Sequence, residues 1–402
     1  MSMEFPILGQ VALSYCPIID RQRNVMATRL TVTPCQPGRP LAVAELLDAL
    51  GQVWPADGQQ VALSVRSETL LGDLMHVQPT TNVMVEVPKF MACDPLHRDA
   101  ILTLAANGNV LLLSGRPDQP LPTPLLGAFK YAIIDLADER RLDANAPVPA
   151  GIHRGIGFFQ DGVRCLADLE SAFKRNAVAV VGWPIDDAVM RKPGRGAASN
   201  RPDLQAIIEL INQVDAEVPL AQLEATLKRD PTLAYKLMRY INSPVFGLSV
   251  EISSFSHAIM LLGYQRLKRW LALLLVTAGN DVNLRPVMFA AVRRGLLMEA
   301  LAPEGAAADT RGEMFICGVF SLLDRMFQMP FADLLKTIPV PDQVYQALVD
   351  GKGPYEYAIG LVRCLEGGTA HDITDMADKA MMDMREVNRA LLKALAGAIE
   401  LG

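Results

Sequence analysis

The chain has 402 residues, of which 50% are hydrophobic and 20% are charged, and its formal net charge at pH 7 is −6. This composition excludes an intrinsically disordered protein, and the length is sufficient for two domains that each bury a core. The negative net charge argues against a protein that neutralises phosphates, so we expect no nucleic-acid partner.

The cysteines and the apolar runs indicate the compartment. Six cysteines are scattered without C-x-x-C spacing, which is typical of thiols in a reducing compartment. The N-terminus has no basic stretch followed by an apolar core. The longest apolar run, Trp270–Val276, is too short to span a bilayer. We therefore expect a cytoplasmic protein that does not insert into membranes.

Residues 1–186 alternate short β-rich runs with helical patterns such as Val43–Leu50, Leu96–Ala106 and Leu166–Arg175. Buried strands that alternate with helices favour a parallel sheet, and eight of them favour a closed TIM-type (β/α) barrel. The segment is short for this fold, and Asp143–Pro149 leaves no room for a usual crossover helix, so we expect a trimmed barrel. The predicted strands are Gln10–Tyr15, Val25–Val32, Gln60–Val65, Val83–Val87, Val110–Leu113, Ala132–Leu136, Gly155–Gln160 and Ala177–Val181.

The stretch LSYCPIIDRQRNVMATRLTVTP, which begins at Leu13, resembles the start of an EAL domain, a barrel that hydrolyses cyclic-di-GMP. The family's Pro-Ile-hydrophobic turn is kept at Pro17–Asp20, but its motif glutamate falls on Arg29. The resemblance covers roughly residues 8 to 186 and implies a degenerate EAL domain.

The chemistry of that family needs carboxylates around two divalent metals, which activate the attacking water. The resemblance leaves three acids in place, Glu86, Asp135 and Asp161. The other expected positions carry different residues. Ser64 replaces an asparagine, and Ser114-Gly115 replaces an aspartate pair. Ile133 replaces the catalytic lysine, and Arg164 replaces a second acid. The resemblance therefore implies no catalytic residues, no metal and no cofactor.

Arg29, Arg116 and Arg164 replace or adjoin acidic positions at the C-terminal rim of the expected barrel, where such folds keep their sites. One interpretation is an anion site that binds phosphates without a metal, because guanidinium groups suit phosphate oxygens. The other is that the arginines form ion pairs with the remaining carboxylates, whose proximity favours this second interpretation.

The composition changes near residue 186. Residues 187–202 have linker composition, and residues 203–402 are predicted to be helical throughout. In the run Arg229–Gly263, Asp230 is suited to cap a helix that starts with Pro231, and Gly263 is suited to end the next helix. The first of these helices is expected to stop at Asn242-Ser243-Pro244.

These motifs resemble the HDOD domain, a helical module related to the HD phosphohydrolases but without their metal-binding residues. The resemblance covers roughly residues 200 to 330. Where a true HD enzyme carries its His-Asp pair, this chain has Ser321-Leu322, which cannot hold a metal. A degenerate EAL domain followed by an HDOD domain is the EAL-HDOD arrangement, also called YuxH-like.

Three features of the helical part have more than one interpretation. Asp372 is expected to cap a helix rather than to form an HD site with His371. A stripe of apolar residues in Met384–Leu401 should dock on the helical domain. A basic face is expected on these helices, and it comprises Lys268, Arg269, Arg293 and Arg294. This face is either solvated, which is the usual case, or binds nucleic acid.

Both resemblances imply enzyme-like domains without catalytic residues. We therefore expect a non-catalytic bacterial signal-transduction protein that acts as a protein-interaction scaffold or regulatory module. The resemblance implies partners such as sensor kinases or cyclic-di-GMP pathway proteins. The alternative is a metal-independent receptor for cyclic-di-GMP or another phosphorylated nucleotide at the barrel mouth, and a residual phosphodiesterase is a third interpretation.

Overall fold

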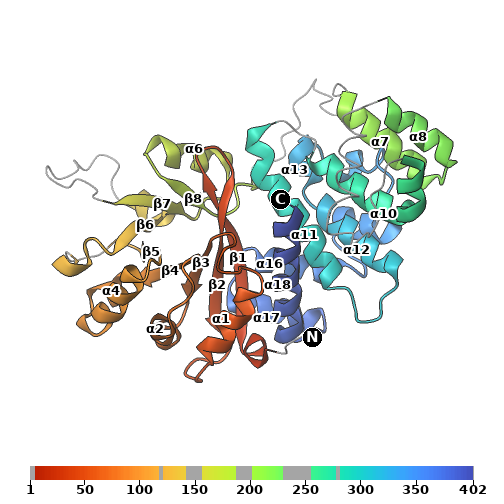
Figure 1. The fold of residues 1–402 in the computed structure, drawn as a ribbon. Coiled ribbons are helices and arrows are strands. Elements are labelled where there is room, and N and C mark those ends of the chain that lie inside the picture. Colours follow the sequence, from red (N-terminus) through yellow and green to blue (C-terminus); the bar gives the residue numbers. More distant parts are fainter. Residues whose placement is uncertain are drawn as a thin grey trace. The chain divides into compact units, whose positions relative to one another are not determined.

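The computed structural model describes residues 5–116, 121–141, 156–186, 202–229, 255–277 and 281–401. The chain divides into two compact units (Figure 1). Unit 1 comprises Met1–Asp187 and Arg363–Leu392, and unit 2 comprises Ala188–Val362 and Lys393–Gly402.

Unit 1 is built on a closed barrel in which eight strands follow one another in chain order, as predicted. The predicted strands are all present, with boundaries that differ by a few residues. The strands are β1 (Val11–Asp20), β2 (Val25–Pro34), β3 (Val61–Val65), β4 (Val83–Pro88), β5 (Leu111–Ser114), β6 (Phe129–Asp135), β7 (Gly157–Asp161) and β8 (Ala179–Val181).

The first strand differs from the predicted parallel arrangement. β1 runs antiparallel to both of its neighbours, β2 and β8, whereas each pair from β2–β3 to β7–β8 is parallel. The reason is the short turn after β1, in which the Asp20 amide donates to the Asn24 carbonyl (2.9 Å) and Arg23 has a positive φ of 67°. A turn this short can only connect antiparallel strands, since a parallel crossover needs a dozen residues or more.

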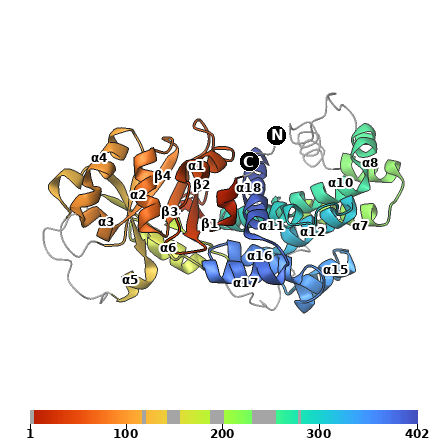
Figure 2. The same cartoon turned by 90° about the horizontal axis from the view of Figure 1, so that it is seen from below.

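The other strands are connected through short helices, which Figure 2 shows from a second direction. Among the described residues between β5 and β6 the only helix is the 3₁₀ turn η3 (Thr123–Leu125). The segment Asp143–Pro149, where we expected no room for a crossover helix, lies outside the described residues. The helices of this part are α1 (Val43–Gly51), α2 (Glu68–Val77), α3 (Lys89–Cys93), η2 (Pro95–His97), α4 (Arg98–Ala106), α5 (Leu136–Arg141) and α6 (Leu166–Lys174).

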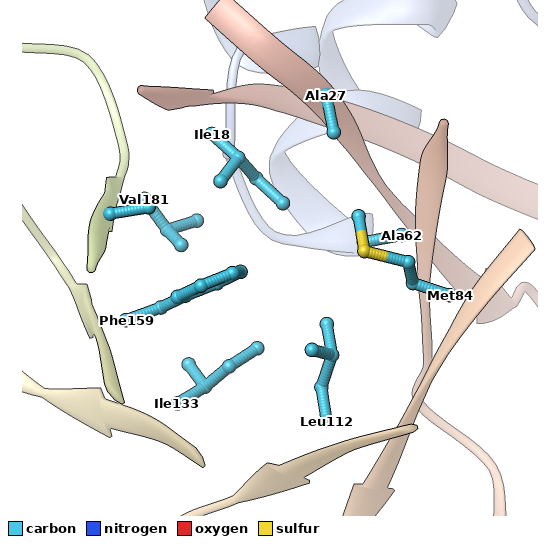
Figure 3. Close-up of a cluster of buried hydrophobic side chains, with 9 residues drawn as sticks. Ile18, Ala27, Ala62, Met84, Leu112, Ile133, Phe159 and Val181 are labelled. Atoms are coloured by element: carbon cyan, nitrogen blue, oxygen red, sulfur yellow. The ribbon is translucent and has the colours of Figure 1, made fainter. Parts of the chain in front are cut away.

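The inside of the barrel is filled by one layer of apolar side chains to which every strand contributes (Figure 3). Their exposed fractions are 3% or less, so this layer is a packed core and not a channel. We call it the interior layer; it consists of Ile18, Ala27, Ala62, Met84, Leu112, Ile133, Phe159, Ala179 and Val181.

Unit 2 is entirely helical in its described residues, as predicted. Its helices are α7 (Pro202–Asp215), α8 (Leu220–Lys228), α10 (Phe255–Thr277), η5 (Val282–Leu284), α11 (Arg285–Ala300), α12 (Ala308–Phe320), α13 (Leu323–Phe327), α14 (Phe331–Leu334), α15 (Asp342–Tyr345), the π-helix η6 (Gln346–Asp350) and most of α16 (Glu356–Leu365). None of the described helices is long and apolar enough to cross a membrane.

Of the motif residues expected in unit 2, Gly263 lies within the described residues. Gly263 has a φ of 69° and a ψ of 169°, which are not helical values, so the helix breaks there and the label α10 covers the segments on both sides. The remaining motif residues lie outside the described residues, as does the predicted linker up to residue 201; these motif residues are Asp230, Pro231, Asn242, Ser243 and Pro244.

The C-terminal helices differ most from the predicted organisation, which assigned all of residues 203–402 to the helical domain. The end of α16, the helix α17 (Ala370–Lys379) and the first half of α18 (Met384–Leu401) belong to unit 1 with the barrel. In the expected docking stripe, Val387 and Leu391 are buried within this part, and only Leu395 and Ile399 fall in unit 2. The physical cause is Asn388, whose side chain bonds to backbone groups at the start of β1.

Candidate functional site at the mouth of the barrel

The mouth of the barrel is lined by residues that lie two positions beyond the interior layer. Since side chains alternate between the two faces of a strand, these residues also point inward. On β2, β3, β4 and β7 they are Arg29, Ser64, Glu86 and Asp161. β1 runs in the opposite direction and places Cys16 directly across from Arg29.

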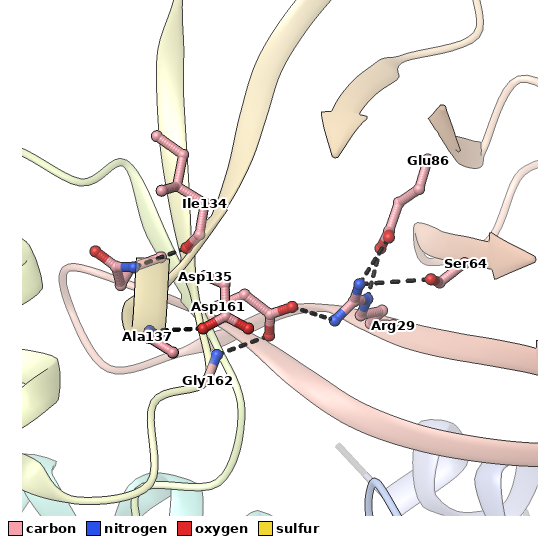
Figure 4. Close-up of polar contacts among 9 residues, drawn as sticks. Arg29, Ser64, Glu86, Ile134, Asp135, Ala137, Asp161 and Gly162 are labelled. Atoms are coloured by element: carbon pink, nitrogen blue, oxygen red, sulfur yellow. Dashed lines mark hydrogen bonds and ion pairs between the residues drawn. The ribbon is translucent and has the colours of Figure 1, made fainter. Parts of the chain in front are cut away.

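Arg29 lies at the centre of a buried ion-pair cluster (Figure 4). Its Nε and Nη2 donate to the two carboxylate oxygens of Glu86 at 2.6 and 2.7 Å, and its Nη1 donates to Asp161 Oδ2 at 2.7 Å. A longer bond of 3.4 Å connects Nη2 to Ser64 Oγ. The Arg29 and Glu86 side chains are 6% and 3% exposed, so this bidentate pair is almost fully removed from water.

The other acids are held by backbone amides. Asp161 Oδ1 accepts a bond from the Gly162 amide at 2.8 Å, and Asp135 Oδ1 accepts one from Ala137 at 2.6 Å (Figure 4). Ala137 lies in the first turn of α5, whose amides lack helical partners, so Asp135 stabilises the start of that helix.

The electrostatics of the cluster stabilise the charged arginine. Burial alone disfavours the charged guanidinium, but Glu86 and Asp161 outweigh it and raise the pKa of Arg29 well above its ordinary value. Burial also raises the pKa of the adjacent Cys16 thiol to about 12, so this cysteine stays neutral at physiological pH.

This arrangement answers the question that the sequence left open for Arg29. The residue forms ion pairs with Glu86 and Asp161, as the second interpretation expected. One cation and two anions make the cluster negative overall, and the Arg29 guanidinium is bonded to carboxylates and shielded from water.

The two other candidate arginines follow the strands β7 and β5. Arg164 follows β7, is largely exposed, and forms an ion pair with Asp186 at 2.7 Å. Arg116 follows β5, is half-buried, and also has interactions of its own.

The residues at the mouth do not fit the divalent metals that an EAL hydrolase would hold. Both carboxylate oxygens of Glu86 are bound to Arg29, which occupies the place beside them that a metal would need. In the part of the chain that the structure describes, no group of three or more His, Cys, Asp and Glu side chains could hold a metal ion.

The second candidate location, at Ser321 in unit 2, is also buried. Arg294 Nη1 donates to Ser321 Oγ at 3.0 Å, and this hydroxyl donates to the Gly318 carbonyl at 2.7 Å. Ser321 therefore helps to fix the end of α12.

The four residues of the expected basic face do not form a set of solvated cations. Lys268 pairs with Asp215 at 2.5 Å, and Arg269 pairs with Glu299. Arg293 and Arg294 are 7% and 5% exposed. Two of these cations are thus paired and two are buried.

The sequence prediction missed Cys16 and Asn388. Cys16 could have been found by counting two positions back from the inward-facing Ile18 once β1 was known to be antiparallel. Asn388 carries no such signal, because a single polar residue on the apolar face of an amphipathic helix does not reveal its partner.

The family comparison identifies the helical part of the chain. Residues 202–332 match the model of the HDOD domain.

Two curated proteins are similar to about half of this chain. Protein YuxH of Bacillus subtilis, described as uncharacterised, is 28% identical over 192 residues, which are 46% of each chain. CdgJ of Vibrio cholerae, named a cyclic di-GMP phosphodiesterase, is 25% identical over 194 residues, which are 48% of this chain and 45% of CdgJ. Each alignment thus spans less than half of the relative's own length.

Solved structures with detectable similarity include BlrP1 of Klebsiella pneumoniae in complex with calcium and cy-diGMP. It is 16% identical with a TM-score of 0.32, covering 46% of this chain and 57% of that one. The EAL enzyme Bd1971, bound to cAMP and cyclic-di-GMP, is 15% identical with a TM-score of 0.31, covering 44% and 61%. These TM-scores are too low to assign a fold or a function to the present barrel, which is defined by its own strand order.

Residues 202–332 form an HDOD domain, and this domain, the eight-stranded barrel before it and the two curated relatives fit an EAL-HDOD protein.

Proposed function

We propose that this chain is a non-catalytic signal-transduction protein that works through contacts with other proteins, in signalling related to cyclic-di-GMP. The observation that carries the proposal is the buried pairing of Arg29 with Glu86 and Asp161 at the barrel mouth.

The proposed lack of hydrolysis is supported by what the pairing does to the carboxylates. Metal-assisted hydrolysis requires oxygens that are free to bind the metals. A metal could approach Glu86 only by displacing a guanidinium that holds both of its oxygens, and the displaced charge would then be buried beside it. The serine at position 64 also replaces a side chain that could donate a carbonyl oxygen to a metal.

The receptor alternative is less well supported by the same contacts. The Arg29 nitrogens are directed at Glu86, Asp161 and Ser64, so a phosphate would have to compete with two carboxylates for them. Binding would also place an anion next to a cluster that is already negative.

The pathway and the partner class rest on similarity. CdgJ is named for cyclic di-GMP, and the EAL-HDOD resemblance implies partners such as sensor kinases and cyclic-di-GMP pathway proteins. A folded barrel and a folded helical domain without catalytic groups provide surfaces for such partners.

The test combines turnover, calorimetry and partner binding on the full chain. We expect no hydrolysis of cyclic-di-GMP with Mg²⁺ or Mn²⁺, no heat on titration with the nucleotide, and measurable binding to a candidate sensor kinase or pathway protein. Metal-dependent turnover that disappears in the Glu86→Gln variant would contradict the proposal. Nucleotide binding that is lost in Arg29→Met but kept in Arg164→Met would support the receptor instead.

A further inference from the structure

The edge of β1 that faces away from β2 is covered in two parts. Near its end, β1 pairs with β8 through Ile18, Ile19 and Asp20, and the Gly182 amide donates to the Pro17 carbonyl at 3.2 Å. β8 is only three residues long, so it reaches only the last part of the ten-residue β1. The backbone groups of the first half therefore need another partner.

Asn388 of α18 supplies that partner. Its Nδ2 donates to the carbonyl of Leu8 and to that of Val11, both at 2.7 Å, and its Oδ1 accepts from the Leu13 amide at 3.2 Å. The backbone polar groups of Val11 and Leu13 point to the same edge of β1 as those of Pro17 and Ile19, which face β8. The Asn388 side-chain amide therefore extends along β1 the row of hydrogen bonds that β8 begins. Asn388 is fully buried, and all three bonds are shielded from water.

The helices around Asn388 pack on the same strand. α17 contacts β1 (Figures 1 and 2), and the first half of α18 reaches the same strand through Asn388. Val387, Leu391 and Ile373 are at most 1% exposed. A Cβ atom added to Gly9 would lie 3.7 Å from the Cβ of Arg385, so the backbones approach each other closely.

We infer that residues Arg363–Leu392 act as a clasp, which closes the free edge of β1 and couples the barrel to the C-terminal helices. The chain enters the clasp from Val362 and leaves it at Lys393, and both of these residues belong to unit 2. A force or a rearrangement transmitted along the chain at either point thus acts on β1. This inference is independent of the proposed function.

The clasp can open without unfolding the barrel. Three bonds to one side chain hold the edge, while β1 keeps its long pairing with β2 and its short pairing with β8. Local opening of this kind exposes only the amides that the clasp covers. The strand that it releases carries Cys16, which lies across from Arg29, so the clasp is connected to the barrel mouth through the strand itself.

Hydrogen exchange of the full chain tests the clasp. Asn388→Ala removes all three bonds and should accelerate exchange of the Leu13 amide by about tenfold or more, because this amide donates to Asn388 and each buried group left unpaired weakens the closed state. Arg389→Ala, at the exposed neighbouring position of the same helix, is the matched control and should leave exchange unchanged. Equal exchange in Asn388→Ala and in the wild type would overturn the inference.

An engineered disulfide provides a second test of the clasp in which Asn388 is unchanged. The Cβ distance at positions 9 and 385 suits a disulfide, so Gly9→Cys with Arg385→Cys should form one under mild oxidation and slow exchange in Val11–Tyr15. The background should carry Cys35→Ser, because the Cys35 amide bonds to the neighbouring Gln10 carbonyl and its thiol could mispair. Failure to form the disulfide in the folded chain, or a disulfide that leaves exchange unchanged, would overturn the inference.

Discussion

Arg29 is a cation inside a barrel, and its surroundings decide whether it stabilises the fold. Moving a guanidinium and two carboxylates out of water carries a large desolvation penalty, which their mutual attraction offsets only with good geometry. The bidentate contact to Glu86 and the bond to Asp161 provide that geometry. Removing one partner should therefore harm the barrel more than removing the whole pair.

A variant series on Arg29 measures this asymmetry. Arg29→Met leaves Glu86 buried without its cation, and we expect the free energy of unfolding to fall by about 3–5 kcal/mol. The double variant Arg29→Met/Glu86→Gln should recover part of the loss, because the almost fully buried Glu86 charge is removed, while Asp161, whose side chain is 22% exposed, keeps its bond from the Gly162 amide. Urea unfolding followed by tryptophan fluorescence is the measurement.

The exposed ion pair supplies the control for that series. Arg164→Met breaks a pair with Asp186 in which the arginine side chain is 78% exposed, so the change should stay within about 0.5 kcal/mol. Equal losses in the free energy of unfolding for Arg29→Met and Arg164→Met would show that burial of the Arg29 cluster contributes nothing to stability.

At the scale of the elements, helices α11 and α12 cross at two glycines. A Cβ at Gly318 would lie 2.3 Å from the Arg294 carbonyl oxygen and 2.7 Å from the Cα of Gly295. These are backbone atoms, which cannot move aside as a flexible side chain would. The close crossing thus depends on the missing side chain, and it positions Arg294 to bond to Ser321.

Two alanine substitutions on α12 test this crossing. Gly318→Ala should lower the free energy of unfolding by roughly 1–3 kcal/mol, because the helices must separate. Gly312→Ala, where a Cβ meets nothing within 4 Å, should be neutral or stabilise by up to about 1 kcal/mol through helix propensity. Thermal unfolding by circular dichroism separates the outcomes, and a stabilising Gly318→Ala would refute the account.

Local sequence patterns were sufficient to predict the elements. The eight strands follow from short β-rich runs, and the predicted last helix has the observed bounds Met384–Leu401. The direction of β1 was not predicted, since it depends on the turn at Asp20–Asn24 and not on the strand itself. For Arg29 two interpretations stayed open, because choosing between them requires knowing that Glu86 and Asp161 reach the same guanidinium.

The surface on which the first half of α18 packs could not be predicted, for a different reason. The apolar spacing in α18 shows that one face of the helix is buried, but it contains no information about which surface covers that face. The bonds that decide it join Asn388 to residues more than 370 positions earlier in the chain. Such long-range pairings leave no local signature.

At the scale of the whole molecule, the two units are interleaved along the sequence. The chain passes between them after Asp187, after Val362 and after Leu392. The residues that the family model matches, 202–332, lie entirely in unit 2. The barrel unit, in contrast, is completed by a segment from beyond that match.

Two C-terminal truncations distinguish an interleaved chain from two successive domains. A chain that ends after Val362 lacks the clasp, and its barrel should be less stable and more rapidly cut by proteases near β1. A chain that ends after Leu392 keeps Asn388 and should retain most of the barrel's protection. Limited proteolysis with mass spectrometry is the measurement, and identical cleavage of the two chains would contradict the prediction.

The clasp also has a consequence for synthesis on the ribosome. Asn388 is made 375 residues after its partner Leu13, which at about 5–20 residues per second is a delay of roughly 20 to 75 seconds. During that interval the N-terminal half of β1 has an edge without its final partner, and unpaired edges promote association between nascent chains. The cell must keep this strand from pairing wrongly until Asn388 has been made, so the yield of folded protein should depend on chaperones that act before α18 is made.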